Sequence, residues 1–388
     1  MSAVRPSIVV GVTSPMSLML MRGLPERLAS EGWEVTVVSS PGPELEALRR
    51  SGVVNVHSVA MAREPSVLAD AKALLAWWRM LRQVRPSVIL VGTPKAGMLG
   101  VVAGLLTRVP VRIYHLRGLR LETSSGVSRL VFRAVESLTL AAATSTVAVS
   151  RSLKQRVADL RLGRGSKVVV LGLGSSNGVD IDRFQPGTSE TGASAARQGL
   201  GLTLDTPVIG YVGRIHPDKG LDTLLAASRL LSTRQVRHQL LVVGGIDHPT
   251  AGELVRRFQD LEADVILPGA VRDAAPYYQA MSVHCLPTLR EGFPNAVLEA
   301  SASGIATVTT DATGAVDSVV SGETGYVVPL GDGTALADAL EHALADQEDL
   351  TRRARNAREW VVSNYSRERV QGHLVGFLRQ ALESAVVR

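Results

Sequence analysis

The chain has 388 residues with 45% hydrophobic side chains, 36 glycines and a formal net charge of +6. This length exceeds what a single hydrophobic core serves, and the largely apolar composition excludes an intrinsically disordered chain. No run of about 20 apolar residues is present to span a membrane, and residues 1–6 lack the regions of a signal peptide. A single cysteine, Cys285, excludes an internal disulfide. We therefore expect a two-domain cytoplasmic protein.

The charge is unevenly distributed along the chain. Residues 1–180 hold 23 Lys/Arg and 11 Asp/Glu, a net of +12, whereas residues 181–388 hold 19 and 25, a net of −6. A basic half favours an anionic partner, either a nucleic acid or a membrane leaflet with its lipid-linked phosphates. An arginine-rich surface without any such partner is the alternative.

Runs rich in valine and isoleucine alternate with amphipathic helical stretches through the first half. The expected strands are residues 7–13, 33–39, 54–60, 88–91, 111–116, 145–149 and 167–171, and the expected helices include 67–85, 96–106, 127–142 and 150–162. Nearly continuous β-branched strands separated by helices specify a parallel sheet covered on both faces. We predict a Rossmann-like α/β domain over residues 1–180.

One predicted helix of this half carries two adjacent tryptophans. Helical spacing turns Trp77 inward and leaves Trp78 near Lys72, Arg79 and Arg82. A basic amphipathic helix with an exposed tryptophan can lie in a membrane interface. The alternative, which is more common, is that Trp78 covers a neighbouring element of the protein.

The alternation stops in a segment rich in serine, glycine and alanine, so residues 181–206 are the candidate linker. It restarts with expected strands at 207–213, 239–244, 265–268, 283–286, 306–310 and 326–328. We predict a second doubly wound domain over residues 207–366. A C-terminal helix over residues 367–388 is long enough to cross back to the first domain.

The first expected strand of the second domain ends in a turn that carries two cations. Gly213 and Gly220 bracket this turn, and Arg214 and Lys219 lie within it, just before a helix. A guanidinium, an ammonium and a helix N-terminus together favour a diphosphate. A solvated turn is the alternative for these two cations.

A second segment, residues 291–299, places two acids around a glycine turn and a helix start. Pro294 suits the first helical turn, and Gly292 lets a ligand approach the free N–H groups there. A glycosidase pair is disfavoured because eight helical residues span about 12 Å, beyond the ~5 to 9.5 Å that such carboxyls need. Glu291 and Glu299 are therefore expected to hold different parts of one ligand. Taken singly, each could be a solvated acid.

These two motifs, Gly-Arg-x4-Lys-Gly and Glu-Gly-Phe-Pro-Asn-x3-Glu, resemble those of the fourth family of retaining glycosyltransferases, and the similarity covers nearly the whole chain. The resemblance implies the GT-B fold, in which two Rossmann-like domains face a cleft. It implies that Glu291 lies by the donor sugar, Glu299 holds the ribose, and Arg214 with Lys219 holds the diphosphate. The implied donor-binding residues are Gly213, Arg214, Lys219, Glu291, Gly292, Phe293, Pro294, Asn295 and Glu299.

Residues 93–100, 113–120 and 174–180 resemble the subgroup that moves N-acetylated amino sugars, usually from UDP, onto polyprenyl-diphosphate-linked glycans of capsules, exopolysaccharides or glycoproteins. Many members carry His-Gly after the fifth strand, whereas this chain has Arg117-Gly118 with His115 two residues earlier, so either side chain can contact the sugar. The residues assigned to catalysis are Glu291, Arg214, Lys219, His115 and Arg117. Those assigned to the acceptor or sugar side are Ser14, Ser17, Lys95, Arg117 and Asn177.

The resemblance implies retention without a nucleophile from the enzyme. The leaving diphosphate would be stabilised by Arg214 and Lys219 and would itself deprotonate the incoming hydroxyl on the same face. No metal is expected, because the first half has no Asp-x-Asp pair and the eight histidines and one cysteine show no ligand spacing. No cofactor is expected beyond the nucleotide sugar, which is a co-substrate.

The expected partners are a nucleotide sugar and a glycan acceptor that is either lipid-linked or a small molecule. The expected location is the cytoplasm, with peripheral association at the anionic inner face of the plasma membrane as a further expectation. A nucleic acid is not expected, because RNA-binding aromatics are lacking. The alternatives are a glycosyltransferase that decorates a soluble or phosphoglycolipid natural product and a noncatalytic nucleotide-sugar-binding protein.

Overall fold

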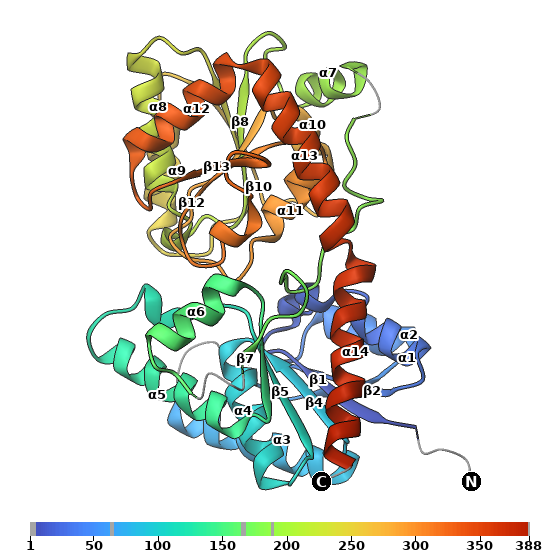
Figure 1. The fold of residues 1–388 in the computed structure, drawn as a ribbon. Helices are drawn as coiled ribbons and strands as arrows, with labels where there is room; N and C mark the ends of the chain where they lie inside the picture. Colours follow the sequence, from blue (N-terminus) through green and yellow to red (C-terminus); the bar gives the residue numbers. More distant parts are fainter. Residues whose placement is uncertain (1–4, 63–65, 164–167, 188–189, 387–388) are drawn as a thin grey trace. The chain divides into compact units, whose positions relative to one another are not determined.

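The computed structural model describes residues 5–62, 66–163, 168–187 and 190–386. The chain forms two compact units (Figure 1). Unit 1 comprises Met1–Asn177 and Glu368–Arg388, and unit 2 comprises Gly178–Arg367. Where the chain enters and leaves unit 2, Val179 N–H donates to Tyr365 O and Arg367 N–H donates to Val179 O, each at 2.9 Å.

The described residues of unit 1 form a seven-stranded parallel sheet in the order β3-β2-β1-β4-β5-β6-β7. Its strands are β1 (Ser7–Gly11), β2 (Glu34–Ser39), β3 (Asn55–Ser58), β4 (Val88–Gly92), β5 (Val111–Leu116), β6 (Ser145–Ala148) and β7 (Val168–Val169). Lys167, where the last strand of this half was expected to start, lies outside the described residues. The central strands are buried on both faces, as their β-branched sequences predict.

Helices cover this sheet. They are α1 (Leu24–Ser30), α2 (Pro43–Ser51), α3 (Val67–Val84), α4 (Pro94–Leu106), α5 (Gly126–Ala142), α6 (Arg151–Asp159) and α14 (Arg367–Val386), with 3-10 turns η1 (Pro15–Met21) and η2 (Arg120–Glu122). Leu374, Val375 and Leu378 of α14 are buried in one apolar cluster with Ile8 and Val10 of β1. The last helix of the chain therefore completes the core of unit 1.

The two tryptophans of α3 have different environments. Trp77 is fully buried, and its ring fills the space that a Cβ at Gly11 would need. Trp78 is half-buried, and the guanidinium of Arg82 lies 5.1 Å from its ring centroid. The predicted inward orientation of Trp77 is confirmed.

Helix α5 buries its only carboxylate. Glu136 is buried on the side that faces the sheet, where the Tyr114 hydroxyl of β5 donates to its Oε2 at 3.2 Å. Burial raises the pKa of Glu136 to about 7 from its usual 4.5. Burial also raises the pKa of Tyr114 well above its usual range. Burial thus favours the protonated carboxyl, and the hydrogen bond from Tyr114 partly opposes this effect.

The described residues of unit 2 form a six-stranded parallel sheet in the order β10-β9-β8-β11-β12-β13. The strands are β8 (Val208–Val212), β9 (Gln239–Val243), β10 (Asp264–Gly269), β11 (Val283–Leu286), β12 (Thr307–Thr310) and β13 (Gly325–Val328). The helices are α7 (Glu190–Gly199), α8 (Leu221–Thr233), α9 (Ala251–Gln259), α10 (Ala275–Ala280), α11 (Asn295–Ala302), α12 (Gly333–Ala345) and α13 (Gln347–Tyr365), with 3-10 turns η4 (Pro217–Lys219) and η5 (Val316–Ser318).

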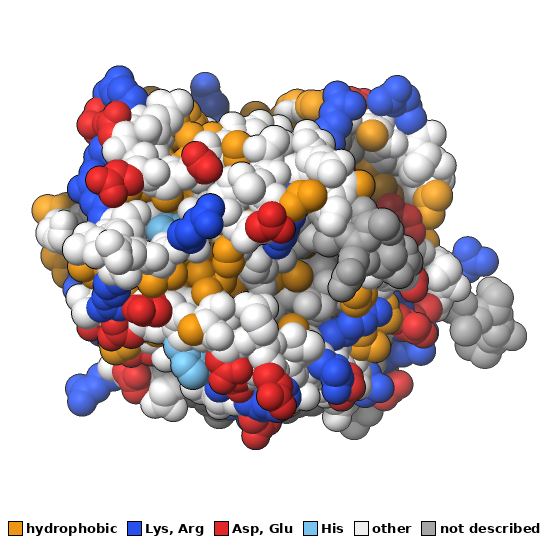
Figure 2. Space-filling model, turned by 90° about the horizontal axis from the view of Figure 1, so that it is seen from above, with side chains coloured by type: hydrophobic (Ala, Val, Ile, Leu, Met, Phe, Trp, Pro, Cys, Tyr) orange, Lys and Arg blue, Asp and Glu red, His pale blue; other side chains and the backbone are white. Residues whose placement is uncertain are grey.

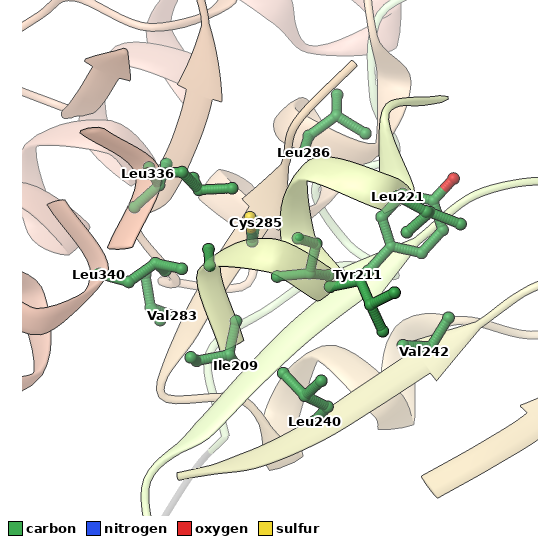
Figure 3. Close-up of a cluster of buried hydrophobic side chains, with 14 of the residues drawn as sticks. Ile209, Tyr211, Leu221, Leu240, Val242, Val283, Cys285, Leu286, Leu336 and Leu340 are labelled. Carbon is green, nitrogen blue, oxygen red and sulfur yellow. The ribbon is translucent and has the colours of Figure 1, made fainter. Parts of the chain in front are cut away.

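The core of unit 2 lies between this sheet and its covering helices. Figure 3 shows Ile209, Leu240, Cys285 and Leu336 converging from β8, β9, β11 and α12. On the face drawn in Figure 2, acidic and basic side chains are interspersed and are not gathered by sign.

The segment of residues 181–206, expected to be a linker, contains helix α7, which packs against α10. Arg197 donates from Nε to Ala280 O and from Nη2 to Ser282 Oγ, both at 3.0 Å. These bonds tie the segment to unit 2, although residues 188–189 within it lie outside the described structure.

The predicted fold class is confirmed, because each unit is an α/β Rossmann-like structure on one parallel sheet. In both sheets the strand order reverses between the first and fourth strands of the unit, which are β1 and β4 in unit 1 and β8 and β11 in unit 2. Loops at the carboxyl ends of such strand pairs form the ligand sites of doubly wound folds. Among the described residues, no helix is both long enough and apolar enough to cross a bilayer.

The burial of Glu136 predicts a pH dependence of stability. Its pKa of about 7 in the folded state exceeds the usual 4.5, so between these values the native state binds more protons than the unfolded state. The free energy of unfolding should therefore fall by up to about 3 kcal/mol as pH rises from about 4.5 to about 7. Glu136→Gln should remove this fall. We expect the difference in thermal unfolding midpoint between wild type and variant to change across pH 5 to 8. The exposed control Glu44→Gln should keep a constant difference from the wild type in unfolding midpoint at every pH. The same constant difference for Glu136→Gln would contradict the prediction.

Candidate active site

The loops that follow β8 and β11 meet at the carboxyl edge of the unit 2 sheet. Gly220, with φ of +63°, lies so close to Pro287 that an added Cβ would stand 1.8 Å from its carbonyl oxygen. Asp218 O accepts hydrogen bonds from Leu289 N–H at 2.9 Å and Thr288 Oγ1 at 3.0 Å. Only glycine permits this approach, and the hydrogen bonds then fix the two loops to each other.

The first charged contact between these loops joins Lys219 to Glu291. Lys219 Nζ lies 2.5 Å from Glu291 Oε1, and the two side chains are only 15% and 13% exposed. Glu291 is placed by its own backbone, because its N–H donates to Thr313 O at 2.8 Å. The predicted phosphate-binding cation and the predicted sugar-side acid are therefore partners of each other.

A second ion pair joins the same two loops, with the acid now on the loop after β8 and the cation on the loop after β11. Arg290 Nη2 pairs with Asp218 Oδ2, and both side chains are largely shielded from solvent. Adjacent residues of one loop, Asp218 and Lys219, thus pair with adjacent residues of the other, Arg290 and Glu291. The sequence motifs alone indicate no role for Asp218 or Arg290. Their positions directly beside Lys219 and Glu291 are the signal that could have identified them.

Arg214 reaches a third loop of the same edge. Its guanidinium pairs with Asp247, which follows β9, and the Arg214 side chain is half exposed. Tyr211 of β8 donates its hydroxyl to Arg214 O at 2.8 Å, and an added Cβ at Gly213 would lie 2.6 Å from that hydroxyl oxygen. Gly213 therefore makes room for the bond that holds the backbone of Arg214. Asp247 was missed, although its place just after a Gly-Gly pair at a strand end could have indicated it.

Glu299 lies on α11 and is held from α10. Tyr278 Oη donates to Glu299 Oε2 at 3.0 Å and is 3.2 Å from Ala296 O. Tyr278 is completely buried, with its ring edge-on to Phe184 and His284. Burial raises the pKa of Tyr278 well above its usual range, so the hydroxyl remains a donor. No sequence signal distinguishes this tyrosine from its neighbour Tyr277.

The remaining residues of the predicted donor segment divide into packing and polar groups. Phe293 is buried with its ring centroid 5.2 Å from that of Tyr365, so it offers a ligand only its backbone. Pro294 precedes the first helical residue of α11, one position earlier than predicted, because the helix begins at Asn295. The Oδ1 atom of Asn295 is buried and lacks a hydrogen-bond partner within the described chain. It is an acceptor open to a ligand donor.

The corresponding edge of unit 1 holds three residues predicted for the acceptor side. Ser14 caps η1, where Ser17 N–H donates to its Oγ at 3.3 Å. Lys95 Nζ lies 2.7 Å from Asp70 Oδ1. The loops after β1 and β4 are joined by the Thr13 and Thr93 hydroxyls, which are 2.7 Å apart. Ser14 and Ser17, in the segment that follows β1, and Lys95, in the first turn of α4, therefore lie near one switch point.

His115 and Arg117 form a buried pair at the end of β5. Arg117 Nη2 donates to His115 Nδ1 at 3.2 Å, so the proton of the neutral imidazole is on Nε2. Burial, reinforced by Arg117, holds the pKa of His115 well below its usual range, and burial lowers the pKa of Arg117 to about 10. His115 Nε2 and Arg117 Nε and Nη1 are buried without a partner in the described structure. These N–H groups are donors available to a ligand.

His115 lines a small hollow of unit 1 together with residues 174–177 and Gln371. Ser176 Oγ in this hollow is also buried without a partner among the described residues. Asn177 differs, because its Nδ2 donates to Arg22 O at 3.0 Å and its Oδ1 accepts from Gln371 Nε2 at 3.0 Å. Of the residues predicted here, His115 and Arg117 have unused donors, whereas the amide of Asn177 joins the loop to α14.

No group of three or more His, Cys, Asp or Glu residues in the described parts of the chain could hold a metal ion. His284 is fully buried, and burial lowers its pKa to about 3. His284 is therefore a neutral packing residue.

The sequence matches two protein families, and the two matches together cover most of the chain. Residues 19–174 match the family described as "Glycosyl transferase 4-like domain" and residues 206–346 match "Glycosyl transferases group 1". The "Capsular polysaccharide biosynthesis glycosyltransferase CapM" of Staphylococcus aureus is 35% identical over 356 residues, which are 92% of each chain. The chain belongs to this glycosyltransferase family. It is accordingly a glycosyltransferase of EC class 2.4.

More distant proteins match most of the length of this glycosyltransferase. The "UDP-Gal:alpha-D-GlcNAc-diphosphoundecaprenol alpha-1,3-galactosyltransferase" of Escherichia coli is 23% identical over 88% of this chain and 87% of that protein. The structure of Anabaena Alr3699/HepE in complex with UDP and glucose has a TM-score of 0.80 at 19% identity, covering 97% of this chain and all of the other. These structural neighbours identify the fold as GT-B.

The crossed ion pairs predict that Asp218 and Arg290 support glycosyl transfer through Lys219 and Glu291. Asp218→Asn and Arg290→Gln should each lower kcat/KM by roughly tenfold, because either change leaves a shielded charge unpaired beside the site. The double variant should be no worse than the poorer single variant, with a coupling of about 1 kcal/mol.

The matched control is the half-exposed pair of Arg234 and Glu341 between α8 and α12, where Nη1 and Oε2 are 2.7 Å apart. Arg234→Gln and Glu341→Gln should leave kcat/KM within about twofold. Additive losses from the Asp218 and Arg290 variants in steady-state kinetics would contradict the coupling.

Proposed function

We propose that this glycosyltransferase moves an N-acetylated amino sugar from a UDP-sugar to a polyprenyl-diphosphate-linked glycan, with retention of the anomeric configuration. The relatives support the two substrate classes. One is named for capsular polysaccharide biosynthesis, and the other for a UDP-galactose donor and a diphosphoundecaprenol-linked acceptor. The observation that carries the donor assignment is the cluster of Arg214, Lys219 and Glu291 at the switch point of unit 2.

The donor diphosphate is proposed to bind between the loops after β8 and β11. Lys219 and Arg214 supply the two cations there, and the first N–H groups of α8 and α11 point toward the same edge of the sheet. Glu299, oriented by Tyr278, accepts hydrogen bonds from the ribose hydroxyls. The arrangement thus provides one set of binding groups for the phosphates and a separate one for the ribose.

Donor binding would exchange the partner of Lys219. A diphosphate carries more charge than a carboxylate, so it competes with Glu291 for the Lys219 ammonium. Glu291 then needs other hydrogen-bond donors, because it lies in a largely buried position. The hydroxyl or N-acetyl groups of the donor sugar are such donors. Glu291 would in this way be directed toward the sugar ring as the diphosphate arrives.

The proposed reaction needs no nucleophile from the protein. The bond between the anomeric carbon and the diphosphate oxygen breaks, the acceptor oxygen bonds to the same face, and the acceptor proton passes to the leaving diphosphate. Lys219 and Arg214 stabilise the charge that develops on this leaving group, and Glu291 favours the positive charge at the anomeric carbon. In unit 1, the neutral His115 offers Nε2–H to a sugar oxygen.

A transfer assay tests the substrate classes. The protein is incubated with UDP-N-acetylglucosamine, UDP-N-acetylgalactosamine, UDP-glucose or UDP-galactose, and with one glycan supplied either on undecaprenyl diphosphate or as its methyl glycoside. We expect transfer from a UDP-amino sugar to the lipid-linked form, with the donor's anomeric configuration in the product by NMR. Transfer to the methyl glycoside alone would overturn the lipid-linked acceptor, and preference for a UDP-hexose would overturn the amino sugar.

The two glutamates should respond differently to loss of charge. Glu299→Gln should raise the donor KM and weaken UDP binding by about tenfold, because a ribose contact is present in ground and transition states alike. Glu291→Gln should lower kcat by about a hundredfold, because it removes a charge that acts on the reacting sugar. It should leave UDP affinity equal or higher, since UDP no longer competes with a carboxylate for Lys219.

Calorimetric titration of UDP and steady-state kinetics measure both effects. Glu348→Gln, an exposed residue in the first turn of α13, is the charge-matched control and should change neither. The reverse pattern, in which Glu291→Gln loses UDP and Glu299→Gln does not, would exchange the two roles.

A further inference from the structure

Helix α5 carries a solvent-exposed row of aliphatic side chains. Val127, Leu130, Val131 and Leu138 are 77%, 66%, 45% and 52% exposed. Their spacing of three, four and eleven residues from Val127 places all four on one side of the helix. A row of this length on one helix is more than the scattered apolar residues that any protein surface shows.

The opposite side of α5 is the buried one, and it is partly polar. Glu136, Thr139 and Leu140 face the interior, where Glu136 accepts its hydrogen bond from Tyr114. A surface helix of a water-soluble protein turns its apolar side to the core and its acids to solvent. Helix α5 instead buries its acid and exposes its aliphatic row.

The neighbouring helix adds two more exposed aliphatic side chains. Helix α4 packs against α5 (Figure 1). Its last two residues, Leu105 and Leu106, are exposed. Each helix follows a parallel strand, so both run from the carboxyl edge of the sheet toward its amino edge and end at the same edge. We define the apolar face of unit 1 as Leu105, Leu106, Val127, Leu130, Val131 and Leu138.

The charges beside this face are basic. Arg129 and Arg133 of α5 are exposed, and the guanidinium of Arg120 lies 5.0 Å from the ring centroid of Phe132. The one acid of α5, Glu136, is buried. Along α5, therefore, exposed aliphatic side chains are accompanied by positive charges and by no exposed negative charge.

We propose that the apolar face of unit 1 docks on an anionic lipid bilayer, with α5 lying in the plane of the headgroup boundary. Aliphatic groups enter the acyl region while flanking arginines contact lipid phosphates, which is how interfacial helices bind. The charge pattern favours a bilayer over a second copy of the chain, because a symmetric contact through α5 would bring the arginines of two copies together. The proposal rests on the proposed function only in that a lipid-linked acceptor is presented at such a surface.

The sequence offers a different candidate for a membrane contact, the helix with two tryptophans, although packing of Trp78 on a neighbouring element is the more common arrangement. The basic helix α3 has the more conspicuous tryptophans, but Trp77 is buried and Trp78 is half-buried beside Arg82. Val67 and Leu68, in the first turn of α3, are nevertheless exposed. They provide a direct comparison between the two helices.

Flotation of the full chain with vesicles tests the proposal. Vesicles of phosphatidylglycerol with phosphatidylethanolamine are compared with pure phosphatidylcholine, without donor or acceptor lipid, so the outcome does not depend on glycosyl transfer. The wild type should float with the anionic vesicles and bind at least about tenfold less to phosphatidylcholine. Failure to float would overturn the docking surface while leaving UDP binding and the proposed reaction to their own assays.

Three variants locate the contact. Val127→Ser combined with Leu130→Ser should weaken vesicle binding at least about tenfold. Arg129→Gln combined with Arg133→Gln should weaken binding to anionic vesicles by about 30-fold and leave phosphatidylcholine binding unchanged. Leu330→Ser, an exposed leucine of unit 2, is the control and should bind as the wild type does.

Two results would overturn the assignment to α5. One is loss of vesicle binding in Val67→Ser with Leu68→Ser but not in the α5 variants, which would move the contact to α3. The other is a wild-type dimer in sedimentation that the Val127 and Leu130 substitutions convert to a monomer without altering flotation, which would make the face a self-association surface. Thermal unfolding of each variant checks that it is folded.

Discussion

The close approach of two loops at the carboxyl edge of the unit 2 sheet determines the rest of the candidate donor site. Gly220 touches the backbone of Pro287, and two crossed ion pairs join the loops at the next residues. Each loop contributes one acid and one cation, so these two pairs together carry a net charge of zero. Pairing keeps each of the four charges compensated in the folded chain, whereas an unpaired charge at the same depth would oppose folding.

Three acids of this chain lie in three different environments, and the environment rather than the residue type sets what each can do. Glu291 is paired with an ammonium, and Glu299 accepts a hydrogen bond from a buried phenol. Glu136 is buried with the Tyr114 phenol as its hydrogen-bond partner, and burial raises its pKa to about 7. The first two suit charge-based recognition, while the third allows α5 to keep its outer side free of acids.

The sequence predicts the elements of this fold well, because buried parallel strands require long runs of valine and isoleucine, which local composition reveals. It also locates Arg214, Lys219, Glu291 and Glu299, because glycines and a helix start mark their loops. It does not reveal Tyr278, whose role depends on a contact between helices α10 and α11. The orientation of α5 is hidden for a similar reason, since an aliphatic row has the same spacing whether it faces the core or the solvent. Helix α7 was missed because its segment has the composition of a loop.

The position of Cys285 has a practical consequence for chemical labelling. It is the only cysteine of the chain, it is fully buried in β11, and burial raises the pKa of its thiol. Thiol reagents react with an accessible thiolate, so the native protein is close to unreactive toward maleimides. A single cysteine introduced on the exposed side of α5 would therefore accept one fluorophore or spin label without prior removal of Cys285. The signal of the label would then report the polarity of the surroundings of that one position.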